Sequence, residues 1–402
     1  MSDSRSRSTI QLPRGFLFGE LRPDPSKPPT HNPPPPLGPL AAFVGDFAGN
    51  GFNTIFRPDS LATPTSLPIV PPPNPPHDNI LELNLTSETL CFAQSLGNVP
   101  NRGSGNQKDL TLNGIPYIQE VDDITIVGES TPIHLEPGLW MAVPQTDIPQ
   151  IAATVTRMAS IPHGTTIEAQ GLATTQQPGP PAKINPVDIT PIVIASGAPF
   201  RFPSQTVANN NTLRIPQDLT PQAGRITQAM LDDPNSLLRA HISGQNILST
   251  TTIFVSTNPA APLFGGGTDN IAFLLGQPAS PPPNPNADAT QMDATFWIEQ
   301  VEAKFHIPIY TLGPPLLLKA QPSIPGQRVA QFSVTPPFDI HPPGLCITLR
   351  FPQIQYSQNV TLVFNGLKWP HVSVNTLVPA NPVEIPPDSD VWKNAVKGPG
   401  PC

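Results

Sequence analysis

Charged residues are scarce in this chain of 402 residues, of which Asp, Glu, Lys and Arg make up 12%. Average domains contain about a quarter. The formal net charge of −8 is spread along the chain, and its only concentrated positive charge lies near the start, at Arg5, Arg7 and Arg14. Nucleic-acid binding needs a basic patch that neutralises phosphates. We therefore expect no nucleic-acid partner.

Long apolar runs are also missing. None reaches the roughly 18 residues of a membrane-spanning helix, and the polar start of the chain lacks the apolar centre of a secretory signal. We therefore expect a soluble, cytoplasmic protein without a membrane span. Cys91, Cys346 and Cys402 form an odd set without CxxC spacing, which favours reduced thiols over a disulfide framework or a zinc site. No metal site is predicted.

Proline, in contrast, is abundant, with 59 residues, about three times its usual share. A proline inside a helix removes a hydrogen-bond donor and clashes with the preceding turn, so long helices are excluded from most of the chain. Hydrophobic residues make up 38% and come in short runs, which is typical of strands and argues against a disordered chain. The composition predicts a loop-rich, mainly β protein.

The segment 40–58 is the first that is predicted to form a β-strand in the wall of a folded domain. Gly45, Gly49 and Gly51 are spaced so that the backbone can bend sharply and another strand can approach closely. Around them lie apolar side chains: Phe43, Phe47, Phe52, Ile55 and Phe56. A glycine-spaced aromatic strand of this kind is typical of the start of an antiparallel barrel that binds small molecules.

Alternating apolar and polar residues predict further half-buried strands. The predicted segments are 80–92, a hairpin over 110–126 that turns at Asn113-Gly114, 134–144, a hairpin over 153–171 that turns at 162–164, 246–257, 269–276 and 292–307. Thr220-Pro221 and Asp233-Pro234 each pair a capping residue with proline, which predicts two short helices. We expect these helices to cover one mouth of the barrel as a lid.

Three segments, in the same order, resemble nitrobindin-like heme-binding β-barrels. The first is the opening strand, in which Phe47 precedes Gly49 and Gly51, and the others are residues 133–140 and 167–171. The resemblance covers about residues 37–305 and implies a calycin-like barrel, as in fatty-acid-binding proteins, with heme as the implied cofactor. In that family the iron-ligating histidine lies on the closing strand. The corresponding place here, near Met292, has no histidine, and His306 lies at the far end of that strand.

We therefore predict a mainly β protein with three parts. Residues 1–36 form a proline-rich extended leader, and residues 37–306 form an antiparallel calycin-like β-barrel with insertions and two short lid helices. Residues 307–402 form a smaller C-terminal β unit and a proline-rich tail. The oligomeric state stays open at this point.

His134 and Glu136 are the candidate catalytic residues. If strand alternation holds, both side chains face the same side of one strand, close enough for a hydrogen bond. The pair either closes a barrel end or transfers protons. The candidate ligand-binding residues are Arg57, Trp140, Arg157, His163, His241 and Phe296. An arginine inside a barrel pairs with a ligand carboxylate or with a structural acid, whereas the aromatic side chains either line a cavity or fill the core.

Three functions follow from this reading. The first is a barrel that binds an apolar small molecule, with heme as one candidate. The second is an enzyme on the same barrel, either a heme-dependent oxidant or a cofactor-free isomerase or cyclase that uses His134 and Glu136. The third is an interaction protein that recruits partners through its proline-rich segments.

Overall fold

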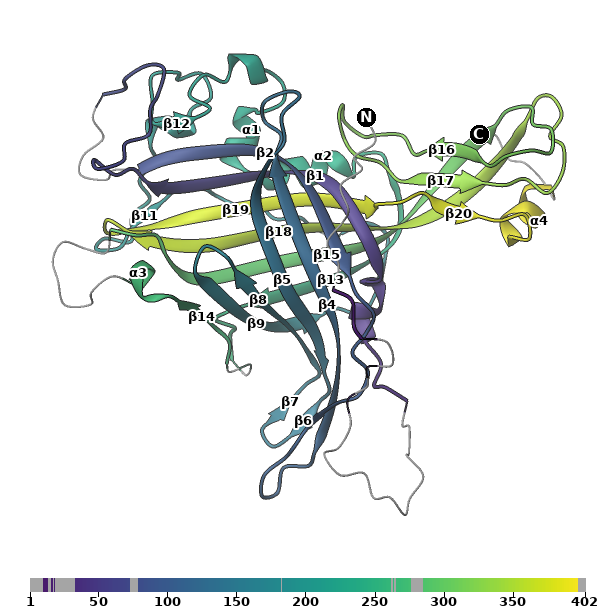
Figure 1. Ribbon diagram of the computed structural model, residues 1–402, viewed down its shortest axis with the longest axis horizontal. Helices are drawn as coiled ribbons and strands as arrows, with labels where there is room; N and C mark the ends of the chain where they lie inside the picture. The colour runs from purple at the N-terminus through teal and green to yellow at the C-terminus, as the bar shows by residue number, and fades with distance from the viewer. Residues whose placement is uncertain are drawn as a thin grey trace.

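The fold is seen in a computed structural model that describes residues 10–13, 16, 18, 33–72, 79–181, 183–261, 263, 265–275 and 285–396. The protein is mainly β, with 48% strand and 9% helix, and its centre is a closed antiparallel barrel of ten strands. Figure 1 shows the barrel strands crossing the middle of the molecule. The expected fold class, a mainly β barrel with insertions, is confirmed. The leader expected over residues 1–36 lies largely outside the described residues.

The barrel strands are joined edge to edge in a complete ring. In order around the ring they are β1 (Gly45–Pro58), β2 (Asn79–Phe92), β4 (Leu110–Asp123), β5 (Thr131–Val143), β8 (Thr154–Ile161), β9 (Thr165–Ala173), β13 (Asn246–Ser256), β15 (Asp288–Ile307), β18 (Leu345–Phe364) and β19 (Leu367–Pro379). Pairing of β9 with β13 and of β19 with β1 closes the ring. A closed ring leaves no free sheet edge within the barrel itself.

Besides the ten strands of this ring, the protein has shorter strands and helices. The strands are β3 (Val99–Asn101), β6 (Thr146–Asp147), β7 (Gln150–Ile151), β10 (Gln177–Pro178), β11 (Ile192–Val193), β12 (Arg214–Ile215), β14 (Gly267–Asn270), β16 (Leu316–Lys319), β17 (Gln331–Val334) and β20 (Val383–Ile385). The helices are η1 (Gly38–Ala42), η2 (Pro203–Gln205), η3 (Thr220–Gln222), α1 (Gln228–Asp232), α2 (Asn235–His241), α3 (Ala272–Leu275) and α4 (Asp390–Val396). Among the described residues, none of the helices has the length and apolarity needed to span a membrane.

Two glycines of β1 allow β19 to pair with it closely. A Cβ atom at Gly49 would lie 1.9 Å from the carbonyl oxygen of Thr376, and one at Gly51 would lie 2.1 Å from that of Val374. Both distances are far below van der Waals contact, so any larger residue would push the strands apart. The glycine spacing of the opening strand therefore serves the β1–β19 junction.

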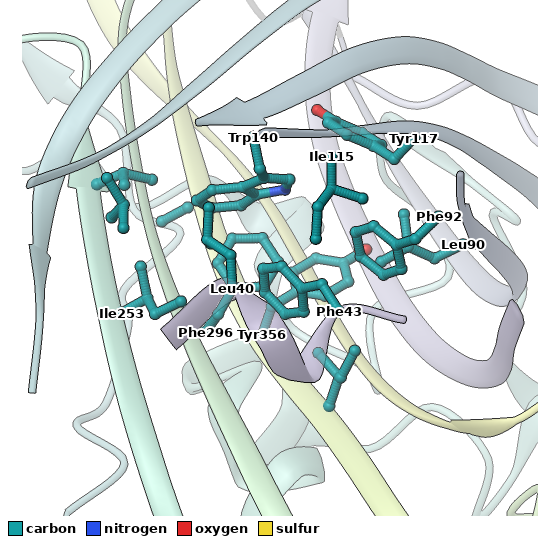
Figure 2. Close-up of a cluster of buried hydrophobic side chains, with 14 of the residues drawn as sticks. Leu40, Phe43, Leu90, Phe92, Ile115, Tyr117, Trp140, Ile253, Phe296 and Tyr356 are labelled. Carbon is teal, nitrogen blue, oxygen red and sulfur yellow. The ribbon is translucent and has the colours of Figure 1, made fainter. Parts of the chain in front are cut away.

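The barrel interior has two halves. The lower half, at the end where β1 begins, is filled by side chains and by η1, which contributes the fully buried Leu40 and is followed directly by the fully buried Phe43. The Phe43 ring stacks on Phe92 with centroids 4.8 Å apart and lies 5.4 Å from Trp140. Figure 2 shows these rings gathered around η1. The upper half, at the end where β1 finishes, contains the cavity described below.

The C-terminal unit is smaller than expected. Strands β18 and β19 belong to the barrel, where β18 pairs with β15 along nearly its whole length and β19 pairs with β1. The expected boundary at residue 306 therefore does not hold for them, because alternation identifies a strand but not its partner. The remaining unit contains β16, β17, β20 and α4, which Figure 1 shows together at one side of the barrel. Its core includes Phe332 and Trp392, packed with Phe305 and Phe351 of the barrel strands.

Of the two predicted helices, α2 follows Asp233-Pro234 as expected, whereas Thr220-Pro221 begins only the short η3 and α1 starts later, at Gln228. Both α1 and α2 cover the wall of the barrel and not its mouth. Helix α1 begins after Thr227, whose Oγ1 accepts a hydrogen bond from the backbone N–H of Met230 at 3.3 Å. Helix α2 packs on the outer face of β18 and β19, where the Nε2 of Gln355 donates to the carbonyl of Leu238 at 2.9 Å. Leu238 joins an outer core with Phe52, so the apolar face of α2 is used against the wall.

Two local expectations are corrected. Asn113-Gly114 lies inside the continuous strand β4 instead of at a hairpin turn. There the Asn113 side chain satisfies neighbouring backbone: its Oδ1 accepts from Gly97 N at 3.1 Å, and its Nδ2 donates to Pro35 O at 2.8 Å. Cys91 is a buried, reduced thiol, as expected, but Cys346 is disulfide-bonded.

Candidate functional site

The upper half of the barrel contains a cavity of about 580 Å³. This volume lies within the range of small-molecule sites, roughly 300–1,000 Å³. Its lining comes from β1, β2, β4, β5, β8, β9, β15, β18 and β19, with Ile215 of β12 and Leu274 of α3 added at the end. Much of the lining is apolar: Ile55, Val121, Ile133, Ile161, Met292 and Val360. The exposed His163 also lines the cavity, which therefore reaches the surface at the upper end.

A buried ion pair lies between the two halves. The Nη2 of Arg157 donates to the Oε1 of Glu136 at 2.7 Å, and both side chains are almost completely buried. The hydroxyl of Tyr117 donates to the same carboxylate oxygen and accepts from the Nε of Arg157 at 2.9 Å. Burial alone would raise the pKa of Glu136, but the charge of Arg157 and the contacts with His134 and Tyr117 lower it to about 2. Glu136 is therefore an anion at neutral pH.

A second buried carboxyl group, Glu88, lacks such a cation. It accepts hydrogen bonds from the Tyr356 hydroxyl at 2.6 Å, the Gln119 Nε2 at 2.8 Å and the Asn375 Nδ2 at 2.9 Å. Burial raises its pKa to about 7, although the bonds from Tyr356 and Gln119 act in the opposite direction. Two carboxyl groups inside one barrel thus titrate far apart, as acid and base groups of active sites often do.

Gln119 connects the two carboxyl groups. Its Nε2 donates to Glu88, and its Oε1 accepts from the Nη2 of Arg157 at 3.4 Å. The Nη1 of Arg157 donates to the Oε1 of Gln358 at 2.5 Å. Gln119, Tyr356 and Gln358 line the cavity, while Glu88, Glu136 and Arg157 lie behind them. The cavity floor therefore presents neutral polar groups that a charged network holds in place.

Among the described residues, three histidines line the cavity. The Nε2 of His134 lies 3.3 Å from the Oε2 of Glu136, and its ring centroid lies 6.1 Å from that of His163. His371 on β19 is the third. Burial lowers the pKa of His371 to about 3, and the charges of His134 and His163 act in the same direction. His371 is therefore a neutral imidazole at physiological pH.

The structure brings together only some of the candidate residues. His134 and Glu136 face the same side of β5 and are hydrogen-bonded, as strand alternation predicted, and Arg157 joins them from the neighbouring strand β8. His134 and His163 line the cavity. The role of these residues in binding or catalysis stays a prediction.

The other candidates lie elsewhere. Trp140 and Phe296 pack against each other in the lower half, 5.1 Å apart, and neither lines the cavity, because η1 fills that end. Arg57 forms an ion pair with Glu82 and donates to Thr65 Oγ1 at 2.7 Å. Its guanidinium group is therefore paired with an acid of the protein itself. His241 is buried on the outer wall, where its Nδ1 lies 2.9 Å from Thr376 Oγ1. It therefore does not reach into the mouth.

Sequence reasoning missed Glu88 and His371. Glu88 lies on a predicted strand, at a position whose neighbours two residues away, Thr86 and Leu90, also face inward. A carboxylate at an inward position is a signal that could have identified it. His371 follows Trp369-Pro370 on β19, and its inward orientation depends on the pairing of β18 with β19, which the pattern does not reveal.

The donor set allows a test of the implied heme. Three imidazoles on the lining are groups that ligate heme iron. The two propionates of heme, however, need cationic or donor partners, and no Lys or Arg is among the described residues that line the cavity. Glu82 and Asp123 line it instead. The charges of the lining therefore do not fit heme. Within the described part of the chain, no group of three His, Cys, Asp or Glu side chains is arranged to hold a metal ion.

Comparison with known proteins adds little to this picture. No protein-family model and no curated protein sequence matches the chain. Among solved structures, the crystal structure of Rv2717c from M. tuberculosis is similar, with 10% sequence identity and a TM-score of 0.32 over 85% of this chain and 96% of that chain. A likeness at this level carries no argument about function. The barrel assignment rests on the strand pairing described above.

Proposed function

We propose that this protein binds a small, largely apolar molecule in the upper half of its barrel. The observation that supports this most directly is the cavity of about 580 Å³, whose lining combines many apolar side chains with polar groups, the neutral ones of its floor and the acids Glu82 and Asp123 among them. Sites for small molecules usually combine these two features. In the lower half, the same barrel is packed with side chains.

A neutral apolar dye tests the proposal. We expect N-phenylnaphthylamine to become fluorescent on binding, with one saturable site per chain. Val360→Trp places an indole inside the cavity and should abolish the signal. Thr361→Trp, at the next position of β18 and facing outward, is the matched control and should bind normally. Equal binding by both variants would place the dye elsewhere and contradict the proposal.

A second candidate is a cofactor-free enzyme, an isomerase or cyclase, on the same barrel. The observation that favours it is the His134–Glu136 contact, in which a carboxylate orients an imidazole that lines the cavity. This is the geometry of a general base held by an acid. If a bound molecule is converted, His134→Ala should stop its conversion, followed by mass spectrometry, with little change in melting temperature. Unchanged conversion by that variant would exclude His134 as the base.

Heme is the less favoured ligand, because the cavity lining carries acids and no cation among its described residues. Hemin titration decides this: a Soret band that saturates at one heme per chain and is lost in Val360→Trp would establish heme as the ligand. A heme-dependent oxidant depends on the same result.

The cytoplasmic location expected from the polar N-terminus also stays a proposal. The disulfide of Cys346 is more typical of oxidising compartments. Alkylation of the protein directly on cell lysis, followed by mass spectrometry, would show whether Cys346 is oxidised where the protein works.

A further inference from the structure

Two neutral hydrogen-bond donors line the cavity with nothing to donate to among the described residues. The first is the Nε2 of Gln358. Its amide is oriented by Arg157, because the Oε1 accepts from the Nη1 of Arg157 at 2.5 Å. The NH₂ group is then the remaining end of the side chain, and it has no hydrogen-bond partner within the described residues.

The second donor is the Nδ1 of His371. The Nδ2 of Asn53 donates to the Nε2 of His371 at 2.9 Å and to the Oγ of Ser373 at 2.7 Å, while the Oδ1 of Asn53 accepts from Asn84 at 3.4 Å. The Nε2 of His371 is therefore an acceptor, and the neutral ring carries its proton on Nδ1. That N–H has no hydrogen-bond partner in the described part of the chain.

The two donors are neighbours on the inner face of the barrel. In the pairing of β18 with β19, Gln358 lies opposite Ser373 and Val360 lies opposite His371. Gln358 and His371 are therefore diagonal neighbours, about 7–8 Å apart between their Cα atoms. Donors at this spacing can converge on one oxygen atom between them.

Among its described lining residues the cavity has no Lys or Arg to pair with an anion, and its His134 already contacts Glu136. Arg157, the nearest buried cation, lies behind the lining and is already bound by Glu136, Tyr117 and Gln358. Glu136 occupies the place that a ligand carboxylate would take beside a barrel arginine. The acids of the lining itself are Asp123 and Glu82, the second of which is paired with Arg57.

We infer that the ligand of this cavity is an apolar molecule with an uncharged carbonyl oxygen (a ketone, aldehyde, ester or amide), which Gln358 and His371 bind by hydrogen bonds, and that it carries no carboxylate. This inference rests on the proposed binding function and specifies the class of ligand. The apolar part of the molecule lies against side chains such as Ile133, Met292 and Val360.

Displacement of N-phenylnaphthylamine near neutral pH tests this inference. The competitors are a methyl ketone, a fatty carboxylate and an alkane of the same chain length. We expect the ketone to bind about tenfold more tightly than either of the others, the combined effect of two modest hydrogen bonds. A carboxylate that binds as tightly as the ketone, or an alkane that does, would overturn the inference. If the dye itself does not bind, the proposed function fails first.

Variants locate the effect. Gln358→Glu keeps an acceptor for Arg157 but removes the unused donor, so the ratio of ketone to alkane affinity should fall about threefold, the share of one of the two hydrogen bonds. Ser357→Glu adds the same charge at the adjacent outward position and should leave the ratio as in the wild type. His371→Phe removes the second donor and should also lower the ratio. A ratio that stays high in both Gln358→Glu and His371→Phe, with dye binding confirming the fold, would contradict the assignment.

Discussion

The lower and upper halves of the barrel are built from the same strands but differ in what fills them. In the lower half, η1 enters the ring, and Leu40 and Phe43 pack with Phe92, Trp140 and Phe296 (Figure 2). In the upper half no such segment of the described chain enters, and a cavity of about 580 Å³ is left. The difference teaches that a short segment before the first strand, and not the barrel itself, determines where a ligand fits.

The border between the halves gives the largest predicted effect. Glu136→Gln leaves the buried Arg157 without its anion, and loss of one partner of a buried pair costs about 3–5 kcal/mol. Urea unfolding at neutral pH measures this loss. Changing Arg157 to Gln as well should recover part of it, and equal losses from the single and double variants would contradict the pairing.

The same pair predicts an acid limit. The pKa of Glu136 is about 2 in the folded protein, against 4.5 for a free glutamate side chain. The unfolded chain therefore binds the proton first, so this stabilisation is complete above pH 4.5 and is lost as the pH falls towards 2. In Glu136→Gln, this part of the acid dependence should disappear.

The packed lower half should respond strongly to a cavity. Phe43→Ala removes a ring that contacts Phe92 and Trp140, and we expect the free energy of unfolding to fall by about 3 kcal/mol, at the lower end of the range for such changes. Thermal or urea unfolding measures this. If Phe43→Ala lost less stability than Ile161→Ala, a variant of the cavity wall in the upper half, then η1 would not fill the barrel.

For Glu88 we expect the free energy of unfolding to depend on pH with the opposite sign. Its pKa is raised from 4.5 to about 7, so the folded state holds the proton more tightly, and the free energy of unfolding falls as the pH rises through this interval. Glu88→Gln stays neutral and should be more stable than the wild type above pH 7, by about 3 kcal/mol. Below pH 4.5 the two should be alike, and parallel pH profiles of unfolding would refute the assignment.

The smallest effect is expected at the cavity wall. Ile161 is half-buried and lines an existing space, so Ile161→Ala should cost only about 1 kcal/mol, less than Phe43→Ala. The dye should still bind this variant. A cost equal to that of Phe43→Ala would show that the two halves are packed alike.

Parts of this arrangement were predictable because they are local. Strand alternation placed His134 and Glu136 on one face, and the glycine spacing identified β1. The ion pair of Glu136 with Arg157 could not be predicted from local patterns alone. It depends on the register of β5 and β8, in which Trp140 lies opposite Arg157. Both residues were candidates, but their pairing was not evident from the chain.

Other features depend on contacts between distant segments. From the sequence, Trp140 and Phe296 could be either cavity lining or core. They are core because η1, about 100 residues before Trp140 along the chain, fills the end of the barrel where they lie. The inward orientation of His371 and the place of β18 and β19 in the ring come from strand pairing across the barrel. Such pairing is set by the sum of many packing contacts and leaves no local pattern.

Closure of the lower end by η1 also determines how molecules move through the protein. Within the described residues the lower end of the barrel is closed by packed side chains, so a ligand of the proposed kind would enter and leave at the upper end, where Leu274 of α3 and Ile215 of β12 line the cavity. A molecule whose polar group reaches Gln358 must enter with that group leading and its apolar tail following. The tail would then lie nearest the opening.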